Sequence, residues 1–194
     1  MQHRLISLAT PAALVAALLL TGCGPSTGDQ GVAPPKPSTS ADAPQGGSSS
    51  RIDLRTEAPG ISLQEAVASA QKSSAGDLRS VELTEMRGDL VYRIELATSE
   101  DEVDITVDAT DGSVLDTRSE PMDRDDASDP AISLSDVIDV ADAMSSATAE
   151  VDAPVDSWTL GFSDGRLVFQ FDFSTSDREV DVDALTGNVV EIDD

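Results

Sequence analysis

The feature that most constrains the fold is an internal repeat. Residues 107–114 read VDATDGSV, and residues 182–189 read VDALTGNV. Upstream of each copy, a glycine opens a segment of alternating apolar residues, GDLVYRIEL at 88–96 and GRLVFQFDF at 165–173. Alternation with a period of two predicts strands with one buried face, and the glycines predict hairpins. Two further pairs of candidate strands match in the same order: 80–86 with 157–163, and 102–108 with 178–183.

A helical pattern precedes the strands in each half. In ISLQEAVASA at 61–70, apolar residues recur on one helical face, Ser62 can cap the helix and Glu65 completes a capping box. The second half offers ISLSDVIDVA at 132–141, which begins with the same three letters. We therefore expect a second helix there, with a matching apolar face made of Leu134, Val137, Ile138 and Ala141.

These patterns predict an α+β fold of two repeats, each with one helix packed on a small antiparallel β-sheet. Repeat 1 covers residues 60–116 and repeat 2 covers residues 132–194. The charged, proline-flanked segment 117–131 between them is predicted to be an acidic linker. Because repeats of this size are near the lower limit for a stable core, packing one against the other would stabilise both. We favour contact, although the sequence is compatible with either arrangement.

The N-terminus has the pattern of an export signal. Residues 1–22 combine a short cationic start with an apolar run too short to span a membrane. They end in LTG before Cys23, which resembles the bacterial lipobox. We therefore expect Cys23 to be the lipid attachment site and the protein to be anchored on the extracytoplasmic face of the cell membrane. Residues 23–59, rich in Gly, Pro and Ser, are predicted to form a disordered tether.

The chain is strongly acidic, with 37 Asp and Glu against 12 Lys and Arg and a formal net charge of −25. This charge repels phosphate backbones and anionic lipids, so we expect no nucleic-acid partner and membrane contact only through the lipid anchor. Signal cleavage would remove His3, the single histidine, and acylation would use Cys23, the single cysteine. Ser-His-Asp, Cys-His and zincin sites then cannot form. We expect no catalytic residues, no enzyme activity and no cofactor.

The repeated VDA phrase raises the question of a calcium loop. Asp108 and Asp111 precede Gly112, as in a calcium loop, but the second copy has Leu185 and Thr186 where further carboxylates should stand. The residues common to both copies suit a turn, because an Asp can accept from nearby backbone amides and a Gly can adopt positive φ. We therefore predict two hairpin turns and no metal site.

Two other sets of side chains could carry function. Trp158 aligns with Val81 at an inward strand position, so we assign it to the core rather than to a partner surface. Four carboxylates could form an acid/base pair, but such clustering is expected by chance in a chain this acidic, and a solvated acidic face is the simpler interpretation. They are Asp104, Asp108, Asp181 and Asp183.

The order of helix, strand, G-x-x-V-[YF]-x-[IF]-[ED], strand and V-D-A-x-[DT]-G-x-V resembles the PepSY domain in both repeats. PepSY modules occur in propeptides of secreted metallopeptidases and in bacterial envelope proteins. The resemblance thus implies a noncatalytic module that binds an envelope protein partner, with a secreted peptidase as the implied class. We expect binding through a sheet edge or the helix-free face of the sheet. The alternative is an acidic, cation-holding or sensor-associated envelope module.

Overall fold

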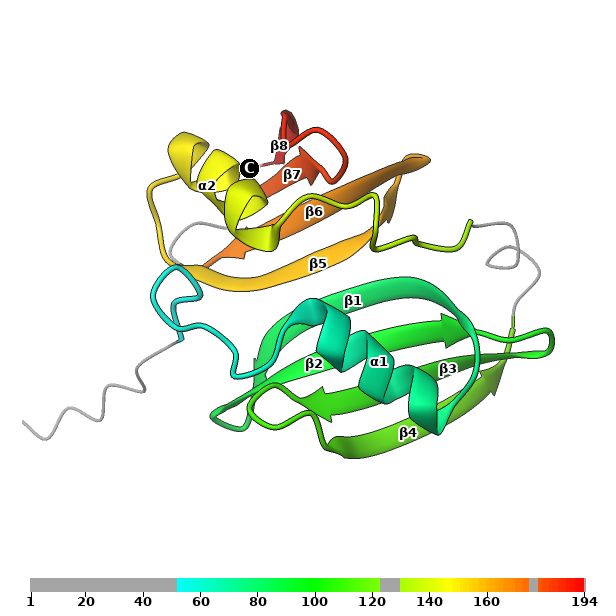
Figure 1. Cartoon of the computed structure of the whole chain (residues 1–194). Helices are drawn as coiled ribbons and strands as arrows, with labels where there is room; N and C mark the ends of the chain where they lie inside the picture. The colour runs from blue at the N-terminus through cyan, green and yellow to red at the C-terminus, as the bar shows by residue number, and fades with distance from the viewer. Residues whose placement is uncertain (1–51, 123–129, 175–177, 194) are drawn as a thin grey trace, which may run out of the picture. The chain divides into compact units, whose positions relative to one another are not determined.

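The computed structural model describes residues 52–122, 130–174 and 178–193, which belong to one compact unit, Gly47–Asp194. Two helices and eight strands follow one another within these residues (Figure 1). In chain order they are α1 (Leu63–Ser73), β1 (Asp77–Met86), β2 (Asp89–Ala97), β3 (Asp101–Asp108), β4 (Val114–Pro121), α2 (Val140–Glu150), β5 (Val155–Ser163), β6 (Arg166–Phe173), β7 (Glu179–Asp183) and β8 (Val189–Asp193).

The strands form a single antiparallel sheet in the order β4-β3-β2-β1-β5-β6-β7-β8. We predicted a small sheet for each repeat, and the structure instead joins the two edge to edge. The junction, which we call the β1–β5 seam, pairs Val81 with Leu160, Glu82 with Thr159 and Leu83 with Trp158. It covers the first strand of each repeat, which would otherwise present unpaired N–H and C=O groups. The α+β class is retained, and the repeats are in contact.

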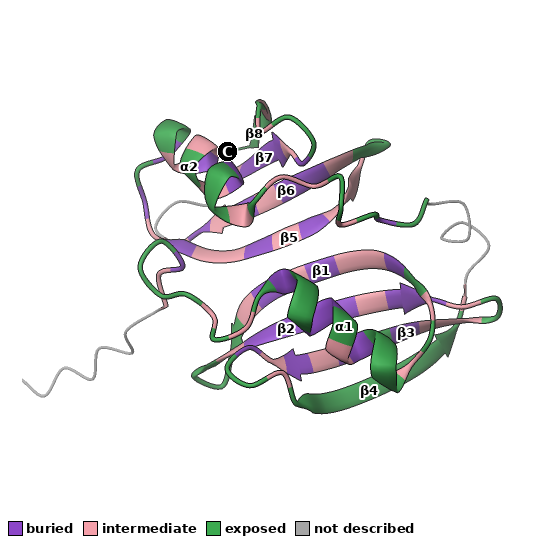
Figure 2. Cartoon of the chain, in the orientation of Figure 1, coloured by how far each residue is buried: buried purple, intermediate pink, exposed green. Residues whose placement is uncertain are grey.

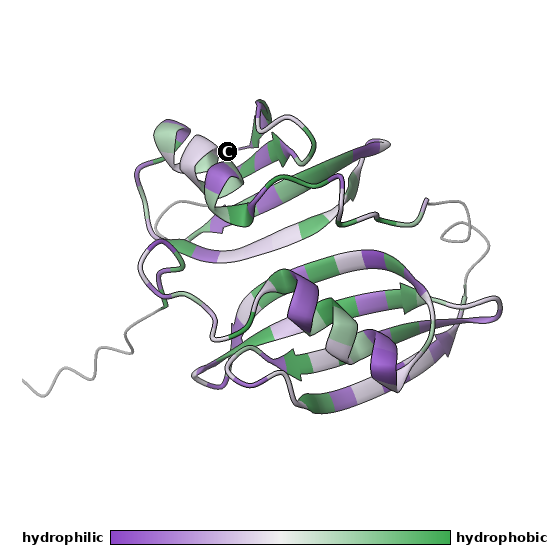
Figure 3. Cartoon of the chain, viewed as in Figure 1, coloured by the Kyte–Doolittle hydropathy of each residue, from purple (hydrophilic) through white to green (hydrophobic). Residues whose placement is uncertain are grey.

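The alternation of side chains divides the sheet into two faces. α1 lies over β2, β3 and β4, and α2 lies over β6 and β7. Figure 2 shows buried and less buried residues alternating along the central strands, and Figure 3 shows the matching alternation in hydropathy. The alternation continues across the seam without a change of face, because the paired residues Val81 and Leu160 are both buried on the face that the helices cover. Both repeats therefore contribute to one hydrophobic core.

Helix α1 forms where the capping box predicted it. The Glu65 amide donates to the Ser62 hydroxyl at 3.3 Å, and the Ser62 amide donates to the Glu65 carboxylate at 2.8 Å. These bonds satisfy two amides that have no partner within the helix. The buried face includes Ala66 and Ala70, both fully buried, whose small side chains allow the helix to pack closely on the sheet.

Helix α2 does not cover the residues that we predicted for it. It begins at Val140, and the carboxylate of Asp139 caps it by accepting from the Ala141 amide at 2.9 Å. Residues 132–139 contain turns and irregular backbone instead of a helix. Of the predicted apolar face, only Ala141 belongs to α2, where it is exposed. The predicted helix over 132–141 is therefore wrong.

A backbone contact across the sheet explains this error. The Ile61 amide donates to the Ala109 carbonyl at 3.0 Å, and the Ile138 amide donates to the Ala184 carbonyl at 2.9 Å. A helix running through Ile138 would need that amide for the carbonyl four residues earlier. Ile138 is thus the counterpart of Ile61, 77 positions later, which is also the separation of the two glycine-led hairpin segments. The repeated letters ISL at 61–63 and 132–134 therefore do not mark equivalent positions in the two repeats.

Two other boundaries differ from the prediction. Strand β4 runs to Pro121, so residues 117–121 are strand rather than linker. Residues 52–59, which we call the strap, are folded rather than part of a tether. Leu54 in the strap is 7% exposed, and its amide donates to the Val155 carbonyl at 2.9 Å. The strap therefore precedes repeat 1 in sequence but is bonded to the first strand of repeat 2.

Candidate functional site

The repeated Asp and Gly residues build two equivalent turns. Gly112 and Gly187 have φ angles of +78° and +76°. Their amides donate to the carbonyls of Asp108 and Asp183 at 2.9 and 2.8 Å. Each Asp carboxylate also accepts from a backbone amide two or three residues further on, at 2.7 and 2.9 Å respectively. The predicted turns are confirmed, with the two residues in the predicted roles.

The carboxylate of Asp111 is also used within its turn. It accepts from the Ser113 amide at 2.8 Å, and this bond lowers the pKa of Asp111. Within the described ranges, no three His, Cys, Asp or Glu side chains are placed to hold a metal ion together. The motif therefore supplies local turn geometry.

The remaining acidic candidates occupy different environments. Asp104 is exposed on β3, whereas Asp181 is buried on β7, and four strands lie between β3 and β7 in the sheet. Asp108 and Asp183 end the same two strands and cap the turns that follow. The four carboxylates are thus divided between two repeats. Only Asp181 departs from the expected solvated acidic face.

Cys23 and residues 1–22 lie outside the described residues, so lipid attachment stays a prediction. Among the residues that the structure describes, no helix is long and apolar enough to cross a membrane.

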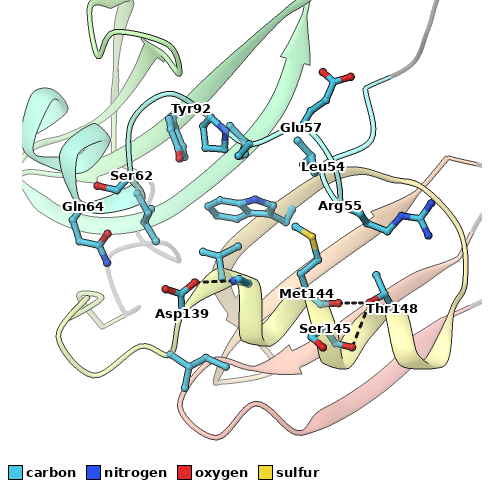
Figure 4. A pocket seen from close by; sticks show the side chains of 18 residues that line it. Leu54, Arg55, Glu57, Ser62, Gln64, Tyr92, Asp139, Met144, Ser145 and Thr148 are labelled. Carbon is cyan, nitrogen blue, oxygen red and sulfur yellow. Dashed lines mark hydrogen bonds between the residues drawn. The ribbon is translucent and has the colours of Figure 1, made fainter.

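An apolar groove with a volume of about 580 Å³ lies between the first turns of α1 and α2 (Figure 4). Its size is in the range of sites that hold small ligands or side chains of a partner. The strap forms one wall, the two helices form others, and β1, β2 and β5 form the floor. We call it the interhelical groove. Both repeats and the strap are needed to build it.

The floor of the groove is aromatic and rigid. The ring of Trp158 meets that of Tyr92 edge-on, with centroids 6.2 Å apart, and meets Phe169 in the same way at 5.8 Å. Trp158 is 2% exposed and Tyr92 is 1% exposed, so neither ring has room to move. The predicted core position of Trp158 is confirmed. Its place beside the seam also makes it part of the groove floor.

Tyr92 connects the floor to the start of α1. Its hydroxyl donates to the Ile61 carbonyl at 3.1 Å. Burial, with a smaller contribution from the Glu65 carboxylate, raises the pKa of Tyr92, so the phenol stays neutral and remains a donor. This bond fixes the entry to α1 relative to the aromatic floor.

An ion pair fastens the strap to repeat 2. The Asp53 carboxylate accepts from the Arg55 guanidinium at 2.9 Å and from the Val155 amide at 3.2 Å. The Arg55 hydrogen bonds hold the pKa of Asp53 below its usual value. Arg55 also lies 3.3 Å from the Asp152 carboxylate. The strap is therefore held as a fixed wall, although half-exposed ion pairs of this kind contribute little to stability.

The α2 wall carries one adaptable side chain. Met144 is half-buried and points from α2 toward the strap, where Leu54 lies (Figure 4). The Thr148 hydroxyl donates to the Met144 carbonyl at 2.8 Å. Because methionine is unbranched and polarizable, it can adjust to different apolar surfaces. The groove thus combines a rigid floor with one flexible wall.

The polar groups around the groove are engaged in the fold. The described residues that line it include neither histidine nor cysteine, and the Asp139 carboxylate is occupied in capping α2. Arg55 is engaged by Asp53. What remains is an apolar floor with exposed polar side chains at the rim, including Gln64 and Ser145. The sequence analysis placed Trp158 in the core but missed the groove, because segments far apart in the sequence form it.

The sheet edges are poorly suited to pairing with another strand. β4 is exposed along its whole length, and β8 is short (Figure 2). Charged residues and a proline oppose strand addition at such edges. In β4 these are Asp116, Arg118, Glu120 and Pro121, and in β8 they are Glu191 and Asp193. Compared with these sheet edges, the interhelical groove is the better candidate for binding.

Comparison with known proteins also finds two copies of one domain in this chain. The chain matches the PepSY family, whose description is "Peptidase propeptide and YPEB domain", over residues 60–118 and again over 131–193. A crystal structure of a candidate lipoprotein from Clostridium difficile 630 aligns with a TM-score of 0.66 at 21% identity, covering 73% of this chain and 97% of that chain. At this identity the likeness shows a shared fold. No curated protein matches the chain. Because the family match covers more than half of the sequence, the chain belongs to the PepSY family and carries two tandem PepSY domains.

Proposed function

We propose that this protein is a noncatalytic module of the cell envelope that holds a segment of a protein partner in the interhelical groove. The observation that carries this proposal is the groove itself, with a volume of about 580 Å³, an aromatic floor and a methionine in one wall. Such a surface can bury large apolar side chains, which contribute most of the binding free energy at protein interfaces.

Charge and shape together define the segment that fits. The floor is apolar, so at least one large aliphatic or aromatic side chain enters the groove. The rim carries the carboxylates of Glu57 and Asp139, and the whole chain has a formal net charge of −25. An acidic segment would be repelled. The partner segment is therefore neutral or basic around an apolar anchor.

A secreted peptidase is the partner class that we propose. The support is the family description, which names peptidase propeptides. Binding would inhibit the peptidase only where the held segment borders its active site. The anchor is the second part of the proposal: diacylglycerol on Cys23 keeps the module at the extracytoplasmic face of the membrane. The related fold of a candidate lipoprotein supports this part.

Site-specific photo-crosslinking in the envelope tests the proposal. A crosslinking residue is placed at Gln64 or Ser145, both exposed at the groove rim, and at Asp104, which is exposed on the helix-free face. We expect one partner species from the two rim positions and none from position 104. Equal yields from all three positions would contradict groove binding.

A matched pair of substitutions sharpens this test. Met144→Lys places a charge in the groove wall, whereas Met86→Lys places the same charge at a side chain that is 38% exposed at the end of β1. Met144→Lys should abolish crosslinking from Ser145, and Met86→Lys should not. If the captured species has no peptidase activity, the peptidase assignment fails while groove binding stands.

A further inference from the structure

The strand β8 has little buried surface to hold it in the sheet. It is five residues long and pairs with β7 at the end of the sheet (Figure 1). Val189 is half-buried, and the other four residues of β8 are exposed. Edge elements with few buried apolar contacts open more readily than central strands. The attachment of β8 therefore depends largely on its backbone ladder and on the side chains that face each other across it.

Carboxylates face each other across this ladder on the helix-free side of the sheet. Asp181 is opposite Glu191, and Glu179 is opposite Asp193. Val180, between the two acidic residues of β7, is fully buried on the side that α2 covers, so the alternation places its neighbours on the other side. Like charges directly opposite each other destabilise a strand pair. The charge of these four side chains thus opposes the attachment of β8.

The equivalent strands of repeat 1 lack this repulsion at the same two positions. Both pairings contain a bulge, and the two pairs compared are those next to it on the helix-free side. In repeat 1 a neutral threonine is opposite Asp116, and Arg118 is opposite Asp104. Arg118 also lies 3.2 Å from the Asp116 carboxylate. A like-charged pair, Glu102 with Glu120, lies beyond the stretch that β8 matches. The repulsion is therefore a property of the β7–β8 pairing and not of the repeat.

Asp181 is the carboxylate of this group that lacks a full set of partners. It is 5% exposed, and its Oδ1 atom is buried without a hydrogen-bond partner among the described residues. Burial, together with the carboxylates of Glu179, Glu191 and Asp193, raises the pKa of Asp181 to about 6. Its register neighbours are Gln170 on β6 and Glu191 on β8. Because β6 is held between two strands, β8 is the neighbour that can leave and uncover Asp181.

We propose that an extended segment of a protein partner replaces β8 along β7, with basic side chains opposite Asp181 and Glu179 and an apolar side chain between them. The register of β8 sets this pattern, because Ile192 is opposite Val180 and lies between the two acidic residues of β8. Charges on β8 oppose addition of a further strand outside it, whereas replacement turns two repulsive pairs into attractive ones. None of these residues lines the interhelical groove, so the site does not depend on the function proposed there.

Three labelled peptides test the replacement on residues 23–194, expressed without acylation. NVVEIDD repeats the sequence of 188–194, NVVKIKD has lysine at the two positions that face the carboxylates of β7, and KKDNVVI has the same composition without the alternation. By fluorescence anisotropy, we expect NVVKIKD to bind saturably and about 10-fold or more tightly than either of the others. No saturable binding of NVVKIKD, or equal binding of KKDNVVI, would overturn the proposal. Equal binding of NVVEIDD would also overturn it, since a second copy of this chain could then supply the strand.

Two double variants locate the binding. Glu191→Lys with Asp193→Lys should hold β8 in place, weaken NVVKIKD binding by about 10-fold or more and slow hydrogen exchange of the β8 amides by a similar factor. Asp116→Lys with Glu120→Lys makes the same change of charge on the exposed strand β4 and should leave NVVKIKD binding within about 2-fold. Equal losses of binding in the two variants, or unchanged β8 exchange in the first, would refute the replacement of β8. The peptides remain decisive on the unmodified chain if a variant fails to fold.

Discussion

Replacing Asp181 with Asn should stabilise the protein at neutral pH. Asp181 is 5% exposed on β7, and one of its carboxylate oxygens has no hydrogen-bond partner in the described structure. Burial, reinforced by the nearby carboxylates of Glu179, Glu191 and Asp193 and opposed by a hydrogen bond from the Ser163 hydroxyl, raises the pKa of Asp181 from 3.8 to about 6. The folded protein therefore holds this proton more tightly than the unfolded chain does.

The sign of the pH dependence follows from this difference. Below about pH 4 the carboxyl is protonated in both states, and its contribution to stability is fully present. As the pH rises from about 4 to 6, the unfolded chain loses this proton while the folded protein keeps it, so unfolding becomes more favourable and that contribution is lost. A shift of about 2 pH units corresponds to about 3 kcal/mol, which is an upper value for the gain in Asp181→Asn because the amide is also buried.

Urea unfolding of both proteins between pH 4 and pH 8 measures this effect. The stability gap between Asp181→Asn and the unmodified chain should open between pH 4 and pH 6 and stay constant above pH 7. Asp104→Asn removes the same charge at an exposed position on the same face and should change stability by less than about 0.5 kcal/mol at every pH. A gap that is the same at pH 4 and pH 8, or equal for both variants, would refute the reasoning.

Three further predictions concern the turns and the anchor. Gly112→Val and Gly187→Val should each cost about 1–3 kcal/mol in thermal melts, because a β-branched residue is strained at positive φ; a loss below about 0.5 kcal/mol would contradict the turn geometry. Asp111→Asn keeps an acceptor for the Ser113 amide, so its melting temperature should be close to that of the unmodified chain with or without millimolar calcium. A calcium-dependent rise that this substitution abolishes would restore the cation-holding alternative. Cys23→Ser should prevent lipid processing and release the protein from the membrane fraction; a processed variant that stays in the membrane would disprove the anchor.

Local patterns predicted the parts of the fold that local interactions determine. The capping box at Ser62 marked the start of α1, and the glycines of the VDA turns adopt the positive φ that the sequence suggested. The start of α2 was missed because a literal match of three letters outweighed the 77-residue spacing kept by the hairpins. Applying that spacing to Ile61 leads to Ile138 and to Asp139 as the helix cap.

Contacts between distant segments could not be predicted in the same way. Whether β1 pairs with β5 depends on the complementarity of two edges, which period-two alternation does not specify. The strap was assigned to the tether as its short end before Pro59, yet Leu54 enters the core. The interhelical groove depends on both of these features. It was therefore absent from the sequence prediction, although Trp158 in its floor was recognised as a core residue.

The emission of Trp158 tests groove binding most directly. Trp158 is the single tryptophan of the chain and forms part of the groove floor. The partner captured by crosslinking is added as a tryptophan-free peptide that spans its crosslinked segment, and the emission is followed to saturation. We predict a saturable change in Trp158 emission that is lost in Met144→Lys and kept in Met86→Lys. Saturable binding of the peptide that leaves Trp158 emission unchanged, or that survives Met144→Lys, would contradict the groove as the binding site.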